Sequence, residues 1–157
     1  PRVRPGGRGF STGGHFKLGP DEAWVVTLRP LGAASMGFQL TDPWGVAYDY
    51  VGRTSSLNDA QAKPNADGSY TFVVSQRDPG VYNWLDPEGQ AAGLFAVRWQ
   101  SLPQGAVPGV AIKDARVVSL AQLKQTLPVE TKLVTPDERK AQQAERAASY
   151  MRRLSQP

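Results

Sequence analysis

The side chains best suited to chemistry in this sequence are arginine, asparagine and tryptophan residues of its middle third. The chain has one histidine, His15, and no cysteine. A thiol nucleophile is therefore excluded, and a Ser-His-Asp arrangement would depend on His15 alone. Guanidinium and amide groups can donate hydrogen bonds to an anionic or carbonyl ligand, and tryptophan rings can wall its apolar part. The candidate ligand-binding residues are Arg53, Asn58, Asn83, Trp84 and Arg98.

The same residue types also have ordinary structural explanations, which the sequence leaves open. Asn83 could satisfy backbone groups at a corner, Trp84 could fill the core, and Arg98 could pair with Asp78 or Asp86. Catalysis without histidine or cysteine would need two carboxylates that act as acid and base. Whether the chain is an enzyme is therefore undecided. Three of the four candidate carboxylates lie in predicted turns, where aspartate is common for structural reasons: the four are Asp49, Asp67, Asp78 and Asp86.

Motifs and charge exclude several classes of function. The sequence has no dinucleotide-binding glycine motif, P-loop, zinc-protease motif, nucleophile elbow or EF-hand loop, so we expect no cofactor and no metal. The net charge is +4, but the basic residues are spread from Arg2 to Arg153 among 14 acids, which does not favour a nucleic-acid partner. No apolar run approaches the ~18–20 residues of a membrane span. The compartment is left open, with a slight preference for the cytoplasm.

Glycine and proline, 16 and 13 of 157 residues, indicate many short strands joined by turns. Strands are predicted at residues 23–29, 34–41, 46–51, 70–75 and 93–100, and either a final pair or one irregular strand within 110–118. Gly37 suggests a bulge or a close backbone approach within its strand. Tyr48 and Tyr50 would share one strand face, either as an acid–base pair, as a stacking platform or as a half-buried surface.

Two helix starts follow the predicted strands. Ser119 with Gln122, and Thr135 with Glu138, have the spacing of a capping box. The first predicts a short helix from 119 to about 126. The second predicts a helix that Thr135 caps, that has Pro136 at its first helical position and that runs to about 154. The second helix carries one narrow apolar stripe, which we expect to lie on the sandwich or on a partner. The stripe consists of Ala144, Ala147, Ala148, Met151 and Leu154.

These elements predict a mostly β chain, an antiparallel jelly-roll-like β-sandwich with a C-terminal helical tail. Residues 1–18 are predicted to be a flexible Gly/Arg-rich arm or linker, 19–118 the sandwich and 119–157 the tail. Because the chain begins with Pro1 and not with methionine, we expect flanking sequence to be missing before it. The predicted core residues are Trp24, Val26, Leu28, Phe38, Leu40, Phe72, Val74, Leu94, Ala96 and either Trp99 or Val97.

The order of several short motifs resembles the domain of unknown function 1214 family over about residues 20–154. The matching motifs are Pro20-Asp21-Glu22-Ala23, residues 53–58 (RTSSLN), Asp67-Gly68-Ser69, Arg77-Asp78-Pro79-Gly80, Asn83-Trp84-Leu85-Asp86, Gly89, Gly93, Arg98-Trp99-Gln100 and residues 135–139 (TPDER). The resemblance implies a jelly-roll-like domain, often found beside a second domain of a longer chain. It implies no reaction. The positions that such a family keeps correspond to Arg53, Asn58, Asp67, Asn83, Trp84 and Arg98.

Three functional hypotheses result. The first is an accessory or assembly domain that packs on a second domain or subunit. The second is a small-molecule binding module with a mouth lined by Arg53, Asn83, Trp84 and Arg98. The third is a hydrolase-like enzyme domain that uses carboxylates and arginines.

Overall fold

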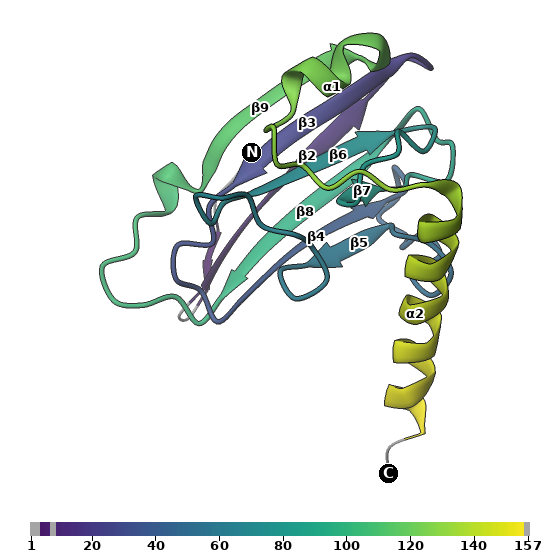
Figure 1. Cartoon of the computed structure of the whole chain (residues 1–157). Coiled ribbons are helices and arrows are strands. Elements are labelled where there is room, and N and C mark those ends of the chain that lie inside the picture. The colour runs from purple at the N-terminus through teal and green to yellow at the C-terminus, as the bar shows by residue number, and fades with distance from the viewer. Residues whose placement is uncertain (1–3, 7–8, 156–157) are drawn as a thin grey trace.

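Two β-sheets and a long C-terminal helix make up the protein in the computed structural model, which describes residues 4–6 and 9–155 (Figure 1). The antiparallel five-stranded sheet runs in the order β1 (Arg4–Gly6), β2 (Gly9–Lys17), β8 (Ala92–Gln100), β4 (Ser35–Thr41) and β5 (Ser56–Asn58). The four-stranded sheet runs in the order β7 (Trp84–Leu85), β6 (Tyr70–Ser75), β3 (Glu22–Leu28) and β9 (Ile112–Ser119), with β7 parallel to β6. The helical elements are η1 (Pro108–Val110), η2 (Leu120–Gln122), α1 (Leu123–Thr126) and α2 (Pro136–Leu154).

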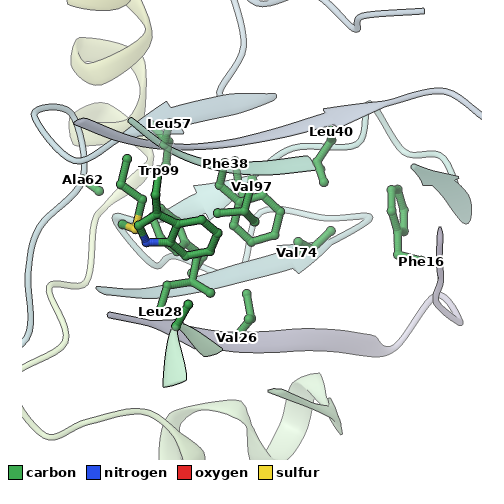
Figure 2. Packing of buried hydrophobic residues seen from close by; sticks show 14 of the residues in the cluster. Phe16, Val26, Leu28, Phe38, Leu40, Leu57, Ala62, Val74, Val97 and Trp99 are labelled. Atoms are coloured by element: carbon green, nitrogen blue, oxygen red, sulfur yellow. The ribbon is translucent and has the colours of Figure 1, made fainter. Parts of the chain in front are cut away.

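The main core lies between the two sheets (Figure 2). Alternate residues of each strand point inward, because successive side chains of a strand leave opposite faces. The mostly β prediction, with a C-terminal helix, is confirmed. Most of the predicted core residues are buried in this cluster: Val26, Leu28, Phe38, Leu40, Phe72, Val74, Val97 and Trp99.

Three core predictions need correction. Trp24 is only partly buried. In β8 the inward face carries Val97 and Trp99, so Leu94 and Ala96 lie on the opposite face and are half-buried. Both faces of this strand are partly apolar in sequence, so the alternation alone did not indicate which face is inside.

The outer face of the four-stranded sheet is covered as well. Val25 and Val73 form a second buried cluster with Val81, Leu123 and Leu127, which places α1 and the chain after it over this sheet (Figure 1). The central strands β3 and β6 are therefore buried on both faces, which explains why their sequences are nearly continuous apolar runs.

Residues 9–17, predicted as part of a flexible arm, instead form β2, a nine-residue strand hydrogen-bonded to β8. Phe10 and Phe16 of β2 are buried in the main core. A side chain at Gly9 would place its Cβ 2.5 Å from the carbonyl oxygen of Trp99, so glycine permits this close pairing. The glycines that suggested disorder are thus explained by sheet packing. Residues 1–3 and 7–8 of the predicted arm lie outside the described residues.

The predicted strand at 46–51 does not form. Ala47 makes an isolated bridge to Thr41, and the chain then turns where the Asp49 carboxylate accepts the N–H groups of Val51 and Gly52 at 2.9 and 2.8 Å. The next strand is β5, in a stretch where no strand was predicted. Tyr48 and Tyr50 therefore share no strand face: Tyr48 is buried and Tyr50 is 46% exposed.

The two predicted helix starts have different outcomes. The Ser119 side chain contacts the Gln122 side chain and caps no backbone group, and η2 leads into a single short turn, α1. At Thr135 the full capping box forms: its hydroxyl accepts the Glu138 N–H, and the Glu138 carboxylate accepts the Thr135 N–H. Helix α2 begins at Pro136 and ends at Leu154, as predicted. Within the described ranges, no helix is both long enough and apolar enough to cross a membrane.

Candidate functional site

The predicted ligand-binding residues do not converge on one cavity. The Arg53 guanidinium forms an ion pair with the buried Asp86 carboxylate at 2.8 Å. Asn83 is buried at a corner, where its amide donates to the Lys63 and Thr71 carbonyls and accepts the Lys63 N–H. Asn83 is therefore a structural residue. The predicted mouth lined jointly by Arg53, Asn83, Trp84 and Arg98 is not formed.

Trp84 is also structural. Its ring is 5% exposed, and its indole N–H donates to the Ser75 carbonyl at 3.1 Å. The Arg139 guanidinium lies over the ring, 5.1 Å from its centroid, so Trp84 forms the floor on which α2 is anchored.

The four candidate carboxylates are engaged separately and form no acid–base pair. The Asp49 carboxylate accepts the Gly52 N–H within its own turn. The other three form ion pairs: Asp67 with Lys113, Asp78 with Arg139, and Asp86 with Arg53. Among the residues that the structure describes, no three histidine, aspartate or glutamate side chains are grouped to hold a metal ion. Nothing in this arrangement resembles a catalytic dyad.

Two of these carboxylates should give opposite pH dependence of stability. Burial raises the pKa of Asp86 above its ordinary 3.8, although the Glu88 N–H and the Arg53 cation oppose this shift. Hydrogen bonding from the Gly52 N–H lowers the pKa of Asp49. The Asp86 contribution is therefore fully present below pH 3.8 and is lost as the pH rises through its folded pKa. The Asp49 contribution is present above pH 3.8 and is lost as the pH falls through its folded pKa.

Urea unfolding of the wild type, Asp86→Asn and Asp49→Asn at a series of pH values tests both signs. The free energy of unfolding of the wild type minus that of Asp86→Asn should fall as the pH rises above 3.8. The same difference for Asp49→Asn should fall as the pH drops below 3.8. Two differences that change in the same direction would contradict the assignment.

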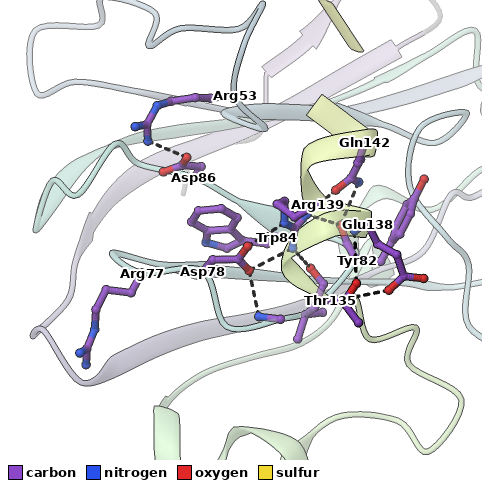
Figure 3. A network of polar contacts seen from close by, with 12 residues as sticks. Arg53, Arg77, Asp78, Tyr82, Trp84, Asp86, Thr135, Glu138, Arg139 and Gln142 are labelled. Carbon is purple, nitrogen blue, oxygen red and sulfur yellow. Dashed lines mark hydrogen bonds and ion pairs between the residues drawn. The ribbon is translucent and has the colours of Figure 1, made fainter. Parts of the chain in front are cut away.

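Helix α2 is fastened to the sandwich by its polar face (Figure 3). Arg139 is 4% exposed; its Nε and Nη2 atoms bind the Asp78 carboxylate at 2.8 and 3.1 Å, and Nη2 also donates to the Val81 carbonyl. The Gln142 amide donates to the Tyr82 carbonyl at 3.2 Å. One turn further, Arg146 donates to the Tyr50 carbonyl and to the Ser56 hydroxyl.

The predicted apolar stripe of α2 therefore faces away from the sandwich. Met151 is 60% exposed and Leu154 is 64% exposed; Ala144 and Ala148 are also exposed, and Ala147 is half-buried. We call these five residues the outward stripe. Hydrogen bonds and ion pairs to the chain around residues 78–82 and 50–56, and not apolar burial, decide which face of the helix is inside.

A groove lies between the polar face of α2 and the outer face of strands β8, β4 and β5. Its volume is about 390 Å³. The lining includes three arginines and two tyrosines, together with amide and hydroxyl side chains such as Asn58. We call it the arginine groove; the residues that define it here are Gly37, Tyr50, Arg98, Arg146, Tyr150 and Arg153.

The groove combines residues that the sequence indicated with residues that it did not. Arg98 and Asn58 were predicted ligand-binding residues and both line it, although Asn58 is also held by reciprocal hydrogen bonds with Gln61. Arg146 and Arg153 lie seven residues apart, two turns along one helix face. The spacing can be read from the sequence, but only the structure shows that this face of α2 is turned toward the sandwich.

Comparisons with known proteins bear on the fold and indicate no activity. No family model matches the sequence, and no curated protein matches it. The crystal structure of an uncharacterised protein from Burkholderia cenocepacia is similar over 73% of this chain, with 30% sequence identity and a TM-score of 0.64. The VPA0106 protein from Vibrio parahaemolyticus is 15% identical over 69% of this chain, with a TM-score of 0.49. This chain spans 31% and 30% of the lengths of those two chains.

Proposed function

We propose that this protein is an accessory domain that assembles with a second copy of itself through the outward stripe of α2. The observation that carries the proposal is the inverted docking of α2. The polar side chains of the helix are hydrogen-bonded to the sandwich, and its apolar face is exposed. An apolar helix face in solution is a typical site of helix–helix association. The alanines within the stripe would allow a close approach of the two helix axes.

The charges of α2 favour an antiparallel pair. Acidic Asp137 and Glu138 lie in its first turn, and basic Arg152 and Arg153 lie in its last. In a two-fold symmetric antiparallel pair, each acidic end lies beside the basic end of its partner, and the two helix dipoles oppose each other. A parallel pair would instead place like charges together.

We also propose that the chain is a member of the domain of unknown function 1214 family, with jelly-roll-like connectivity. Both proposals fit the role of an accessory domain. In support, the chain passes from one sheet to the other between β2, β3 and β4, and again between β7, β8 and β9. The similar Burkholderia chain contains a comparable fold as about a third of its length, which is consistent with an accessory module. The four aspartates serve separate turns and ion pairs, which does not favour a hydrolase-like enzyme.

Sedimentation equilibrium over a wide range of protein concentration tests the assembly. We expect reversible dimers of modest affinity, since a single pair of helices buries less than the ~1,200 Å² of a standard interface. Ala144→Glu and Met151→Glu each place a charge in the stripe at exposed positions, so the fold should tolerate them, and the dimer should be lost. Ala121→Glu is the matched control, because Ala121 is exposed on η2 outside the stripe.

Two results would overturn the proposal. One is a wild-type protein that stays monomeric at all concentrations. The other is a dimer that Ala144→Glu and Met151→Glu leave intact, which would place the interface elsewhere.

A further inference from the structure

Within the described part of the chain, none of the three arginines that line the groove forms an ion pair with a carboxylate. Arg146 is held by a backbone carbonyl and a hydroxyl, at 2.7 and 2.8 Å. Among the described residues that line the groove, none is an aspartate or a glutamate. Elsewhere in the described chain, the arginines in ion pairs with carboxylates are Arg53, Arg77, Arg116, Arg139 and Arg152.

The positive charges of the groove also act on one another. The pKa of Arg146 is lowered by burial and by the charge of Arg153, while the charge of Asp49 partly opposes the shift. A bound anion would relieve this repulsion and would replace the water lost by the half-buried guanidinium. Because arginine presents planar donors that match an oxyanion, this side of the groove is suited to a phosphate or carboxylate group.

Gly37 keeps the floor of the groove open. It lies in the middle of β4, directly opposite Arg98 of β8. A Cβ added at Gly37 would meet no heavy atom within 4 Å, and the strand pairing is regular there, so neither a bulge nor a close approach explains the glycine. The prediction of one or the other is therefore wrong. Glycine weakens the interior of a strand, and what it provides at this position is space above the sheet.

The tyrosines supply an aromatic surface in the same groove. The Tyr50 and Tyr150 rings meet edge to face with their centroids 5.6 Å apart. The volume of about 390 Å³ is in the range of small-molecule sites. A ligand that satisfied these features would carry an anionic group for the arginines and a flat apolar group for the tyrosines.

We propose that the arginine groove binds a small aromatic phosphate. A phosphate monoester carries a charge of about −1.5 to −2 at neutral pH, which matches a site with several guanidinium groups better than a single carboxylate does. Arg98 and Arg153 contact the phosphate oxygens, Arg146 contributes its charge from a fixed position, and the tyrosine pair receives the ring. The proposal does not rest on self-assembly, because the groove lies on the face of α2 opposite the outward stripe.

Isothermal titration calorimetry with phenyl phosphate, inorganic phosphate and benzoate tests the ligand class. Phenyl phosphate should bind with one-to-one stoichiometry and roughly tenfold more tightly than either of the other two, since each provides only part of the contacts. Equal binding of inorganic phosphate would overturn the aromatic part of the proposal, and equal binding of benzoate would overturn the phosphate part. No heat and no saturable binding with any of them would overturn it entirely.

Variants of the groove locate the site. Arg98→Gln should weaken phenyl phosphate binding about tenfold through the loss of one charge-assisted contact, and Gly37→Val should abolish it by filling the floor. Arg152→Gln removes the same charge from α2, but Arg152 is paired with Glu145 and does not line the groove, so binding should be unchanged. Equal losses in Arg98→Gln and Arg152→Gln would show a general charge effect and overturn the site. Sedimentation of the same variants separates this result from self-assembly, which neither Arg98→Gln nor Gly37→Val should alter.

Discussion

Replacing Arg139 with methionine is expected to reduce the free energy needed to detach α2 from the sandwich by about 3 kcal/mol. The methionine keeps the apolar stem but removes the guanidinium donors of the Asp78 carboxylate and the Val81 carbonyl, so that Asp78 retains only the Gly80 N–H. Removal of one partner from a buried ion pair typically costs 3–5 kcal/mol, and the lower end applies because the Asp78 side chain is 34% exposed. Hydrogen exchange should report the change as roughly hundredfold faster exchange of the α2 amides.

Two variants control this experiment. Lys140→Ala alters the adjacent residue, whose side chain is 78% exposed, and should change stability by less than about 0.5 kcal/mol. Arg139→Lys keeps the charge but not the planar fork, so it should give an intermediate loss. If Arg139→Met left the exchange of α2 unchanged, the helix would be held by other contacts and its inverted docking would be in doubt.

Replacing Trp99 with alanine is expected to destabilise the whole sandwich by about 3–5 kcal/mol. Trp99 is 1% exposed in the main core, its ring stacks on Phe10 at a centroid distance of 4.4 Å, and its indole N–H donates to the Arg29 carbonyl at 2.8 Å. The substitution removes the ring, leaves a cavity between the sheets and leaves that carbonyl without its donor. For a domain of this size, the melting temperature should fall by roughly 10 °C or more.

Two further variants test whether the loss of stability comes from the buried position of the Trp99 ring and not from the loss of an aromatic residue as such. Trp99→Phe keeps part of the stacking on Phe10 and should cost less than Trp99→Ala. Trp44→Ala makes the same change at a side chain that is 90% exposed, so its effect should stay within about 0.5 kcal/mol. A melting temperature for Trp99→Ala equal to that of Trp44→Ala would show that the Trp99 ring does not bridge the sheets.

The sequence was most informative where structure depends on neighbours along the chain. The β-branched and aromatic residues of 70–75 indicated the strand that carries Phe72 and Val74 into the core, and Thr135, Pro136 and Glu138 indicated the start of α2. Both signals are local: strand propensity and helix capping depend only on residues a few positions apart.

The sequence was misleading where a distant partner supplies the stabilisation. Residues 9–17 are rich in glycine and were predicted to be flexible, yet pairing with β8 and burial of Phe10 and Phe16 order them as β2. Asn83 was predicted to bind a ligand, but the carbonyls that it satisfies belong to Lys63 and Thr71, 20 and 12 residues earlier in the chain.

By itself, the sequence determined a mostly β protein with a capped C-terminal helix, because strand alternation, turn residues and the capping box are written in short stretches. Only the tertiary structure decided that α2 turns its arginines inward and its apolar stripe outward. The reason is that carbonyl and carboxylate groups of residues 50, 78, 81 and 82 outcompete the weak burial offered by an alanine-rich stripe. That choice created both the arginine groove and the exposed face of the helix.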